Sequence, residues 1–150
     1  MADRVQLELV TPERLLLSEM VEMVVVPGTE GNFGVLPGHA PLISSLRPGT
    51  IDIYEGQTVV RRIFVVSGTA EVTPERCTIL ADEAMAPDEL DRSAIEAELQ
   101  AIQGNLPSLR EQVGRASGAE RETLLVEFRR LERLENLRQA ELRALGEIAR

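Results

Sequence analysis

The chain has 150 residues, of which 43% are apolar and only 3% aromatic, and its formal net charge is −9. This length allows one ordinary domain or a small domain with an appendage, and the negative charge argues against a nucleic-acid partner, because phosphate binding needs a basic surface. One histidine and one cysteine cannot supply the nitrogen and sulfur ligands of a usual zinc site, so we expect no metal.

The first part of the chain has a hydrophobic period of two. Apolar and polar residues alternate at 5–9, and denser apolar runs at 20–26, 59–66 and 77–81 predict strands with more of their surface buried. Turn signals rich in proline and glycine recur about every 8–12 residues, which is typical of an antiparallel sandwich or barrel. The lone Cys77 is expected to be an inert thiol on a buried strand.

After Pro87 the period becomes helical. Asp88 is predicted to cap a first helix over about 88–104, and Gly104 and Pro107 to weaken and stop it. A loop is then expected at 105–118. One face of this helix carries Ile95, Leu99, Ile102 and Leu106.

A second helix is predicted over about 119–148, roughly 45 Å long at 1.5 Å per residue. Its apolar stripe consists of Leu124, Phe128, Leu131, Leu134, Leu142 and Leu145. Opposite charges at spacings that meet on a helix surface are Glu127 with Arg130, Glu135 with Arg138, and Arg143 with Glu147. The predicted fold is mainly β plus α, with an antiparallel β-sandwich of about ten strands at 1–87 and a two-helix hairpin at 88–150.

The sequence offers little for catalysis. The glycines of GTEGNFG (28–34) match neither the phosphate loop nor the dinucleotide fingerprint, and tight turns between paired strands explain them without a ligand. Ser44, Ser45 and Asp52 lie within reach of His39 in sequence, but nothing places them together as a hydrolytic triad. We therefore expect no catalytic residues, and a turn or partner-contact role for His39.

Three segments together resemble the epsilon subunit of the rotary ATP synthase of bacteria and chloroplasts: VPGTEGNFGVLPGHAPLISSLRPG, VVSGTAEVTPERCTILADEA and APDELD. The resemblance covers about residues 4–92 and rests beyond residue 95 on the helix–loop–helix pattern alone. The family's P-G-x-E-G-x-x-G-x-x-P-G-H-A-P-L pattern is matched by Pro27, Gly28, Glu30, Gly31, Gly34, Pro37, Gly38, His39, Ala40, Pro41 and Leu42.

The resemblance implies a non-catalytic subunit without cofactor at the foot of the central stalk. Such subunits bind gamma and the c ring and couple proton-driven ring rotation to ATP synthesis in the catalytic alpha/beta hexamer. In many members the hairpin extends and blocks ATP hydrolysis. Carried over by residue, Glu30, Gly31, Asn32 and Phe33 would face the c ring, and His39, Ala40, Pro41 and Leu42 would face gamma. The expected location is the cytoplasmic face of the bacterial inner membrane, peripheral and without membrane insertion, since no apolar run approaches the ~20 residues of a span.

The sequence departs from the family in its nucleotide motif, [I/L]-D-x-x-R-A. Leu90 and Asp91 are kept, but Ala94 stands where the arginine belongs, so weak or absent ATP binding is expected. The long predicted loop and the second helix, which is charge-balanced and not net basic, also argue against an inhibitory extended hairpin.

Two alternatives remain at the level of sequence. One is a free-standing β-sandwich small-molecule binder or hydrolase using His39. The other is a helical-hairpin interaction module acting through residues 119–150 alone.

Overall fold

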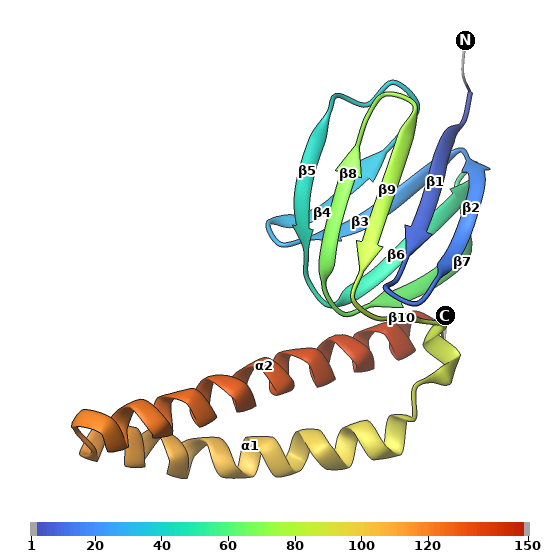
Figure 1. Ribbon diagram of the computed structural model, residues 1–150. Coiled ribbons are helices and arrows are strands. Elements are labelled where there is room, and N and C mark those ends of the chain that lie inside the picture. Colours follow the sequence, from blue (N-terminus) through green and yellow to red (C-terminus); the bar gives the residue numbers. More distant parts are fainter. Residues whose placement is uncertain (1–2, 149–150) are drawn as a thin grey trace. The chain divides into compact units, whose positions relative to one another are not determined.

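The computed structural model describes residues 3–148, which form two compact units, one ending at Glu89 and the other beginning at Leu90. The first unit is a curled ten-stranded sheet (Figure 1). Its strands are β1 (Val5–Val10), β2 (Leu15–Val21), β3 (Met23–Gly28), β4 (Gly31–Val35), β5 (Leu42–Leu46), β6 (Gly49–Glu55), β7 (Thr58–Val65), β8 (Gly68–Val72), β9 (Arg76–Ala81) and β10 (Ala84–Met85).

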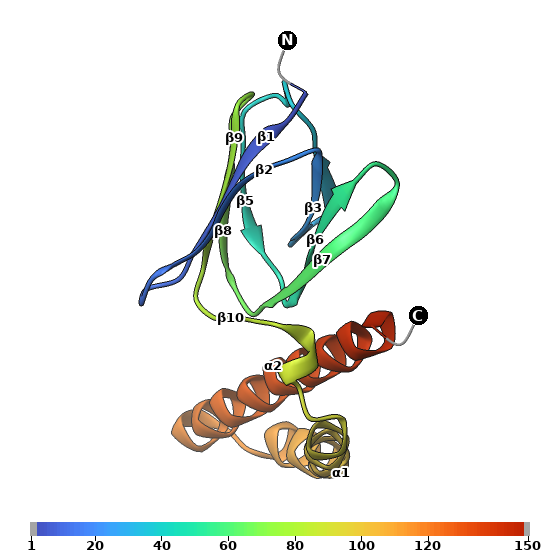
Figure 2. The same cartoon turned by 90° about the vertical axis from the view of Figure 1, so that its right-hand side faces the viewer.

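The sheet folds back on itself into two layers, with β5, β8, β9, β1 and β2 in one layer and β3, β6 and β7 in the other (Figure 2). The strand order is β10-β7-β6-β3-β5-β8-β9-β1-β2, and β4 pairs with β3. This confirms the predicted β-sandwich followed by two helices. One pairing departs from the antiparallel expectation, because β1 runs parallel to β9.

Alternation along each strand builds the core. Val5, Leu7 and Leu9 of β1 point between the layers and are at most 1% exposed. The dense runs are only partly buried, contrary to the prediction that more of their surface is buried. In β9 Ile79 is 0% exposed but Leu80 is 44%. In β7 the exposed Val60 lies near the start, and burial is confined to the end, at Phe64 and Val65. The reason is that each layer has one face on solvent.

Cys77 lies in this core and is fully buried, as predicted. Burial raises the pKa of its thiol to about 12, so the reactive thiolate is not formed near neutrality. The cysteine is therefore a packing residue.

The second unit is a helical hairpin of α1 (Arg92–Arg115) and α2 (Gly118–Ile148), preceded by a 3₁₀ turn, η1 (Pro87–Glu89), in the first unit. The predicted bounds of the second helix, about 119–148, agree with α2, but those of the first helix and the loop were wrong. The first helix begins after Asp91, whose carboxylate accepts a hydrogen bond from the Ala94 backbone N–H at 3.2 Å, and not at Asp88. It then runs through Gly104 and Pro107, so only Ala116 and Ser117 connect the helices, in place of a loop at 105–118.

Packing of an apolar stripe explains this continuation. Glycine costs a helix about 1 kcal/mol and proline about 3 kcal/mol. The stripe continues past the predicted residues to Val113, and α2 packs alongside α1 (Figures 1 and 2). Burial of a large aliphatic side chain stabilises by about 1.5–3 kcal/mol, so the stripe outweighs both breakers. Its buried residues are Ile95, Ile102, Leu106 and Val113.

Polar contacts fix the pairing of the two helices. The Arg110 guanidinium lies 5.5 Å from the centroid of the Phe128 ring, and Arg138 Nε lies 2.6 Å from Glu98 Oε2. Glu127 and Arg130 form the predicted pair at 2.7 Å. Arg138 was predicted to pair with Glu135, but it contacts Glu98 and Glu141 because it is turned toward α1.

The side chain of Glu147, the predicted partner of Arg143, lies outside the described residues. That predicted pair has no outcome in the structure.

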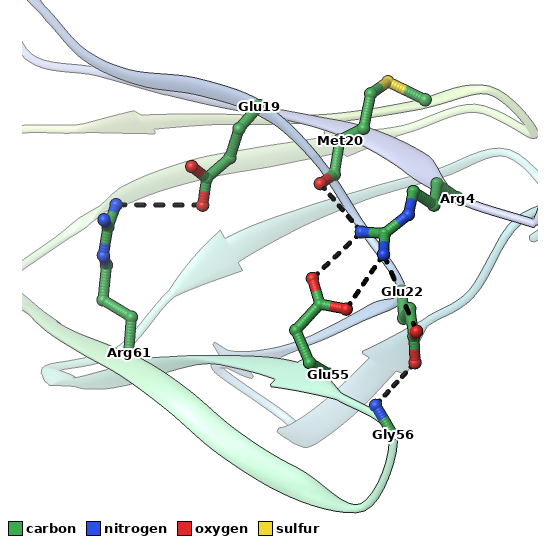
Figure 3. Close-up of polar contacts among 7 residues, drawn as sticks. All are labelled: Arg4, Glu19, Met20, Glu22, Glu55, Gly56 and Arg61. Atoms are coloured by element: carbon green, nitrogen blue, oxygen red, sulfur yellow. Dashed lines mark hydrogen bonds and ion pairs between the residues drawn. The ribbon is translucent and has the colours of Figure 1, made fainter.

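A polar seam closes the open side of the sandwich, where no strand pairing within residues 3–148 joins β2 to β7 (Figure 3). Arg4 forms a forked pair with Glu55, with nitrogen–oxygen distances of 2.9 and 3.1 Å. Glu22 accepts a hydrogen bond from the Gly56 N–H at 2.5 Å, and Arg61 lies 3.7 Å from Glu19. These contacts join the β1–β2 edge to the β6–β7 hairpin.

The close packing of β8 on β9 explains why glycine follows Ser67 in the segment VVSGTAEV. The Ser67 hydroxyl donates to Asp82 Oδ2 at 2.5 Å, and the Asp82 N–H donates to the Ser67 carbonyl at 2.8 Å. Between them Gly68 has φ +139°, and a Cβ added there would lie 2.0 Å from the Leu80 carbonyl oxygen. Only glycine allows β8 and β9 to approach this closely.

We predict that Gly68→Ala destabilises the sandwich by about 3–5 kcal/mol, because the new methyl group meets rigid backbone at a positive φ. Urea unfolding followed by the fluorescence of Tyr54 measures this. Gly34→Ala is the control: its Cβ would meet only Met23 Sδ, at 3.7 Å, and should change stability by less than about 1 kcal/mol. Equal stabilities of the two variants would contradict the prediction.

The seam makes stability depend on pH. The hydrogen bond and charge of Arg4 lower the pKa of Glu55 below its ordinary value, so the unfolded state binds the proton more tightly. The contribution of Glu55 is therefore present above the unfolded pKa of about 4.5 and is lost as pH falls through the lower folded pKa. We expect wild type to be more stable than Glu55→Gln at pH 7, with the difference vanishing in acid.

Urea unfolding at a series of pH values measures this difference, and Arg4→Met should remove the same pH-dependent part. Stability profiles of wild type and Glu55→Gln that stay parallel down to acid would show that the seam makes no such contribution.

Candidate functional site

The segment from Pro27 to Gly49 builds an exposed tip on the sandwich. Strands β3 and β4 form a hairpin in which Gly28 pairs with Gly31, so that Thr29 and Glu30 make the turn. Thr29 and Glu30 are exposed, as are Gly31 and Asn32, while Phe33 is half-buried. The four residues predicted to face the c ring, 30–33, thus lie together on one short hairpin.

The root of this hairpin is packed more closely than a side chain would allow. A Cβ on Gly28 would lie 2.9 Å from the Gly31 carbonyl oxygen, 2.9 Å from Phe33 Cε1 and 3.0 Å from Ser44 Oγ. The glycine is therefore explained by the approach of β3, β4 and β5, without any bound phosphate.

A shallow hollow of about 430 Å³ lies between the hairpin tip and β5. Its walls combine apolar and polar side chains, and Ile43 beside it is 73% exposed. We call it the tip hollow. It is lined by Thr29, Glu30, Gly31, Asn32, Phe33, Leu42, Ile43, Ser44 and Ser45.

The predicted gamma-facing residues, 39–42, lie in the loop between β4 and β5 and at the start of β5. Gly38 has φ +84°, and its N–H donates to the Pro74 carbonyl at 2.8 Å. The His39 N–H donates to the Leu36 carbonyl at 3.1 Å, and His39 Nδ1 lies 2.6 Å from the Ala40 carbonyl oxygen. Backbone hydrogen bonds within the loop and to the connection between β8 and β9 thus hold the loop, and Leu36 and Leu42 are 54% and 38% exposed.

The geometry does not support a hydrolase centred on His39. Ser44 Oγ donates to the Ser45 carbonyl at 3.0 Å, and Asp52 lies 3.6 Å from Arg62, so neither is directed to the histidine. Among the described residues no group of three or more His, Cys, Asp or Glu side chains could hold a metal ion. The residues that a triad would need are engaged elsewhere.

At the degenerate nucleotide motif, the Asp91 carboxylate caps α1 through the Ala94 N–H. The neighbouring Arg92 lies 3.8 Å from Glu96, one turn further along the helix. Leu90 is half-buried and Ala94 exposed. Asp91, which this sequence shares with the motif, serves here to start a helix.

One residue at the tip was missed by sequence reasoning. Arg47 Nη1 donates to the Gly28 carbonyl and Arg47 Nη2 to Asn32 Oδ1, each at 2.5 Å. The available signal was that Arg47 is the only arginine between Pro27 and Gly49.

No helix within residues 3–148 combines the length and apolarity needed to cross a membrane.

Comparison with known proteins identifies the family. The family described as "ATP synthase, Delta/Epsilon chain, beta-sandwich domain" matches residues 4–87. The chain is 53% identical over 120 residues to the ATP synthase epsilon chain of Rhodospirillum rubrum, covering 80% of this chain and 90% of that one. It is 36% identical over 148 residues to the epsilon chain of Rhizobium meliloti, covering 99% and 97%.

The fold also matches a solved chain from the mitochondrial ATP synthase of Euglena gracilis, in a structure of its OSCP, F1 and c-ring parts. The TM-score is 0.72 at 22% identity, over 97% of this chain and 83% of that one. This likeness supports the fold, and the sequence matches carry the assignment. The chain belongs to the ATP synthase epsilon chains, the family whose β-sandwich domain its residues 4–87 form.

Proposed function

We propose that the chain is a non-catalytic subunit of the central stalk that couples c-ring rotation to ATP synthesis through gamma. The observation that carries this is the tip, an exposed hairpin at 29–32. At its root the strands pack so closely around Gly28 that no side chain would fit there. A part that transmits torque must resist bending, and a preformed surface loses little entropy on docking. Membership of the epsilon chains gives that surface its partners.

Within this proposal Glu30, Gly31, Asn32 and Phe33 contact the c ring. The segment His39 to Leu42 contacts gamma, since its backbone-held loop exposes apolar side chains beside the tip hollow. Binding to these partners holds the chain at the cytoplasmic face of a bacterial inner membrane.

We propose that the hairpin does not act as a brake on ATP hydrolysis by the catalytic hexamer. Residues 119–150 contain seven acidic residues and seven arginines, so α2 has no net positive charge with which to bind an acidic surface. The two-residue connection removes the other sequence argument, that of a long loop.

The decisive experiment adds the full chain or residues 1–89 back to an epsilon-depleted synthase in vesicles. We expect both to restore ATP-driven proton pumping. We also expect the rate of ATP hydrolysis to be the same with the full chain as with residues 1–89. Pumping unchanged by the full chain would overturn the proposed function. Slower hydrolysis with the full chain than with 1–89 would show that the hairpin is a brake.

A binding assay with isolated gamma tests the gamma surface. His39→Ala and Pro41→Ala should each weaken binding to isolated gamma by about tenfold, a loss usual for a central interface residue. Their urea midpoints should match wild type, which separates binding from folding. Wild-type affinity in both variants would count against this surface.

A separate prediction concerns the nucleotide motif. Because Asp91 caps α1 and Ala94 replaces the motif's arginine, millimolar ATP should shift the thermal midpoint by less than about 1 °C. Scanning calorimetry of the full chain with and without ATP measures this. A shift of several degrees would contradict it.

A further inference from the structure

Arg47 is placed at the root of the tip hairpin and contacts both of its strands. One guanidinium nitrogen donates to the carbonyl of Gly28, the last residue of β3, at 2.5 Å. Another donates to the side chain of Asn32, in β4, also at 2.5 Å. The planar fork of an arginine therefore joins the two legs of the hairpin to the connection between β5 and β6.

Little else joins this hairpin to β5. The register between β3 and β5 contains one residue pair, Gly28 with Leu46. Two backbone hydrogen bonds flank it, from the Thr29 N–H to Ser45 and from the Arg47 N–H to Pro27, each 3.0 Å. The residues beyond Gly28 extend past these hydrogen bonds. A side-chain contact at the root therefore has a large effect on the position of the tip.

The backbone at Arg47 is itself constrained. Arg47 is half-buried and is followed by Pro48, whose ring fixes its own φ and restricts the residue before it. A Cβ on Gly49 would lie 3.0 Å from Pro27 Cβ, so this bend packs directly on β3. The guanidinium thus starts from a fixed backbone, which reduces the entropy lost in forming its two hydrogen bonds.

We propose that Arg47 is a positioning residue that holds the 29–32 tip in its docking geometry, and that Asn32 acts through Arg47. This gives Asn32 a different role from direct contact with the c ring. Its amide oxygen accepts a hydrogen bond from Arg47, so the side chain supports the shape of the tip. This inference rests on the proposed function, because only the docked subunit gives that shape a consequence.

The first test needs the full chain alone. Hydrogen exchange at the amides of residues 29–34 should be about tenfold faster in Arg47→Ala, since each charge-assisted hydrogen bond is among the stronger ones in proteins. Arg61→Ala is the matched control, because it removes an arginine with a single 3.7 Å ion pair on another strand. Exchange at 77–81 should stay unchanged in both variants, and an unchanged tip in Arg47→Ala would overturn the inference.

The second test measures binding to epsilon-depleted synthase and the restored proton pumping. Arg47→Ala should bind about tenfold more weakly, and Arg47→Lys should fall between it and wild type, because an ammonium keeps the charge but not the fork. Arg61→Ala should match wild type. Asn32→Ala should weaken binding, but not further in the Arg47→Ala background, as a double-mutant cycle shows for residues acting as a unit.

The outcomes separate the two proposals. Failure of the wild-type chain to restore pumping overturns the proposed function, and the docking role of Arg47 with it, while the exchange experiment still decides whether Arg47 holds the tip. Restoration by wild type and Arg47→Ala alike overturns the inference alone. Additive losses from Asn32→Ala and Arg47→Ala overturn the assignment of Asn32.

Discussion

At Gly28, three strands come closer together than any side chain would allow, and the shape of the tip depends on this contact. The hypothetical Cβ distances of 2.9–3.0 Å involve a backbone oxygen, an aromatic ring and a hydroxyl at once, so no single neighbour could move to admit a larger residue. Gly68 plays the same part between β8 and β9, against the Leu80 carbonyl. Gly28 and Gly68 are in this sense packing residues, and they allow the close approach of strands that stiffens the sandwich.

The remainder of the sandwich is held in two different ways. Alternating aliphatic residues fill the space between the layers, while the side without strand pairing is closed by the charged seam of Arg4, Glu22 and Glu55 (Figure 3). Exposed ion pairs contribute little each, so the seam defines the edge more than it stabilises the core. An edge occupied by charged groups is also a poor template for pairing with another chain.

Sequence reasoning succeeded where one physical signal dominates. The period of two gave the strands of the sandwich, and the lone cysteine in an apolar strand gave a buried thiol. It was wrong about Gly104 and Pro107, because local propensity was weighed without the stripe that continues to Val113. It could not find the Arg4–Glu55 pair, 51 residues apart, or the Arg47 contacts, 15 and 19 residues apart, since these depend on which strands pair.

The hairpin shows what a conformational change in this subunit would require. Extending α1 away from α2 would expose Ile102, Leu106 and Val113, each worth about 1.5–3 kcal/mol when buried, and break the Arg138–Glu98 contact. A partner surface would have to bury the same stripe to compensate. Electrostatic attraction cannot supply the difference, because α2 carries nearly balanced charge and its exposed pairs are weak. Whether this subunit regulates hydrolysis therefore depends on an apolar groove in its partner, and only secondarily on the charge of its own helices.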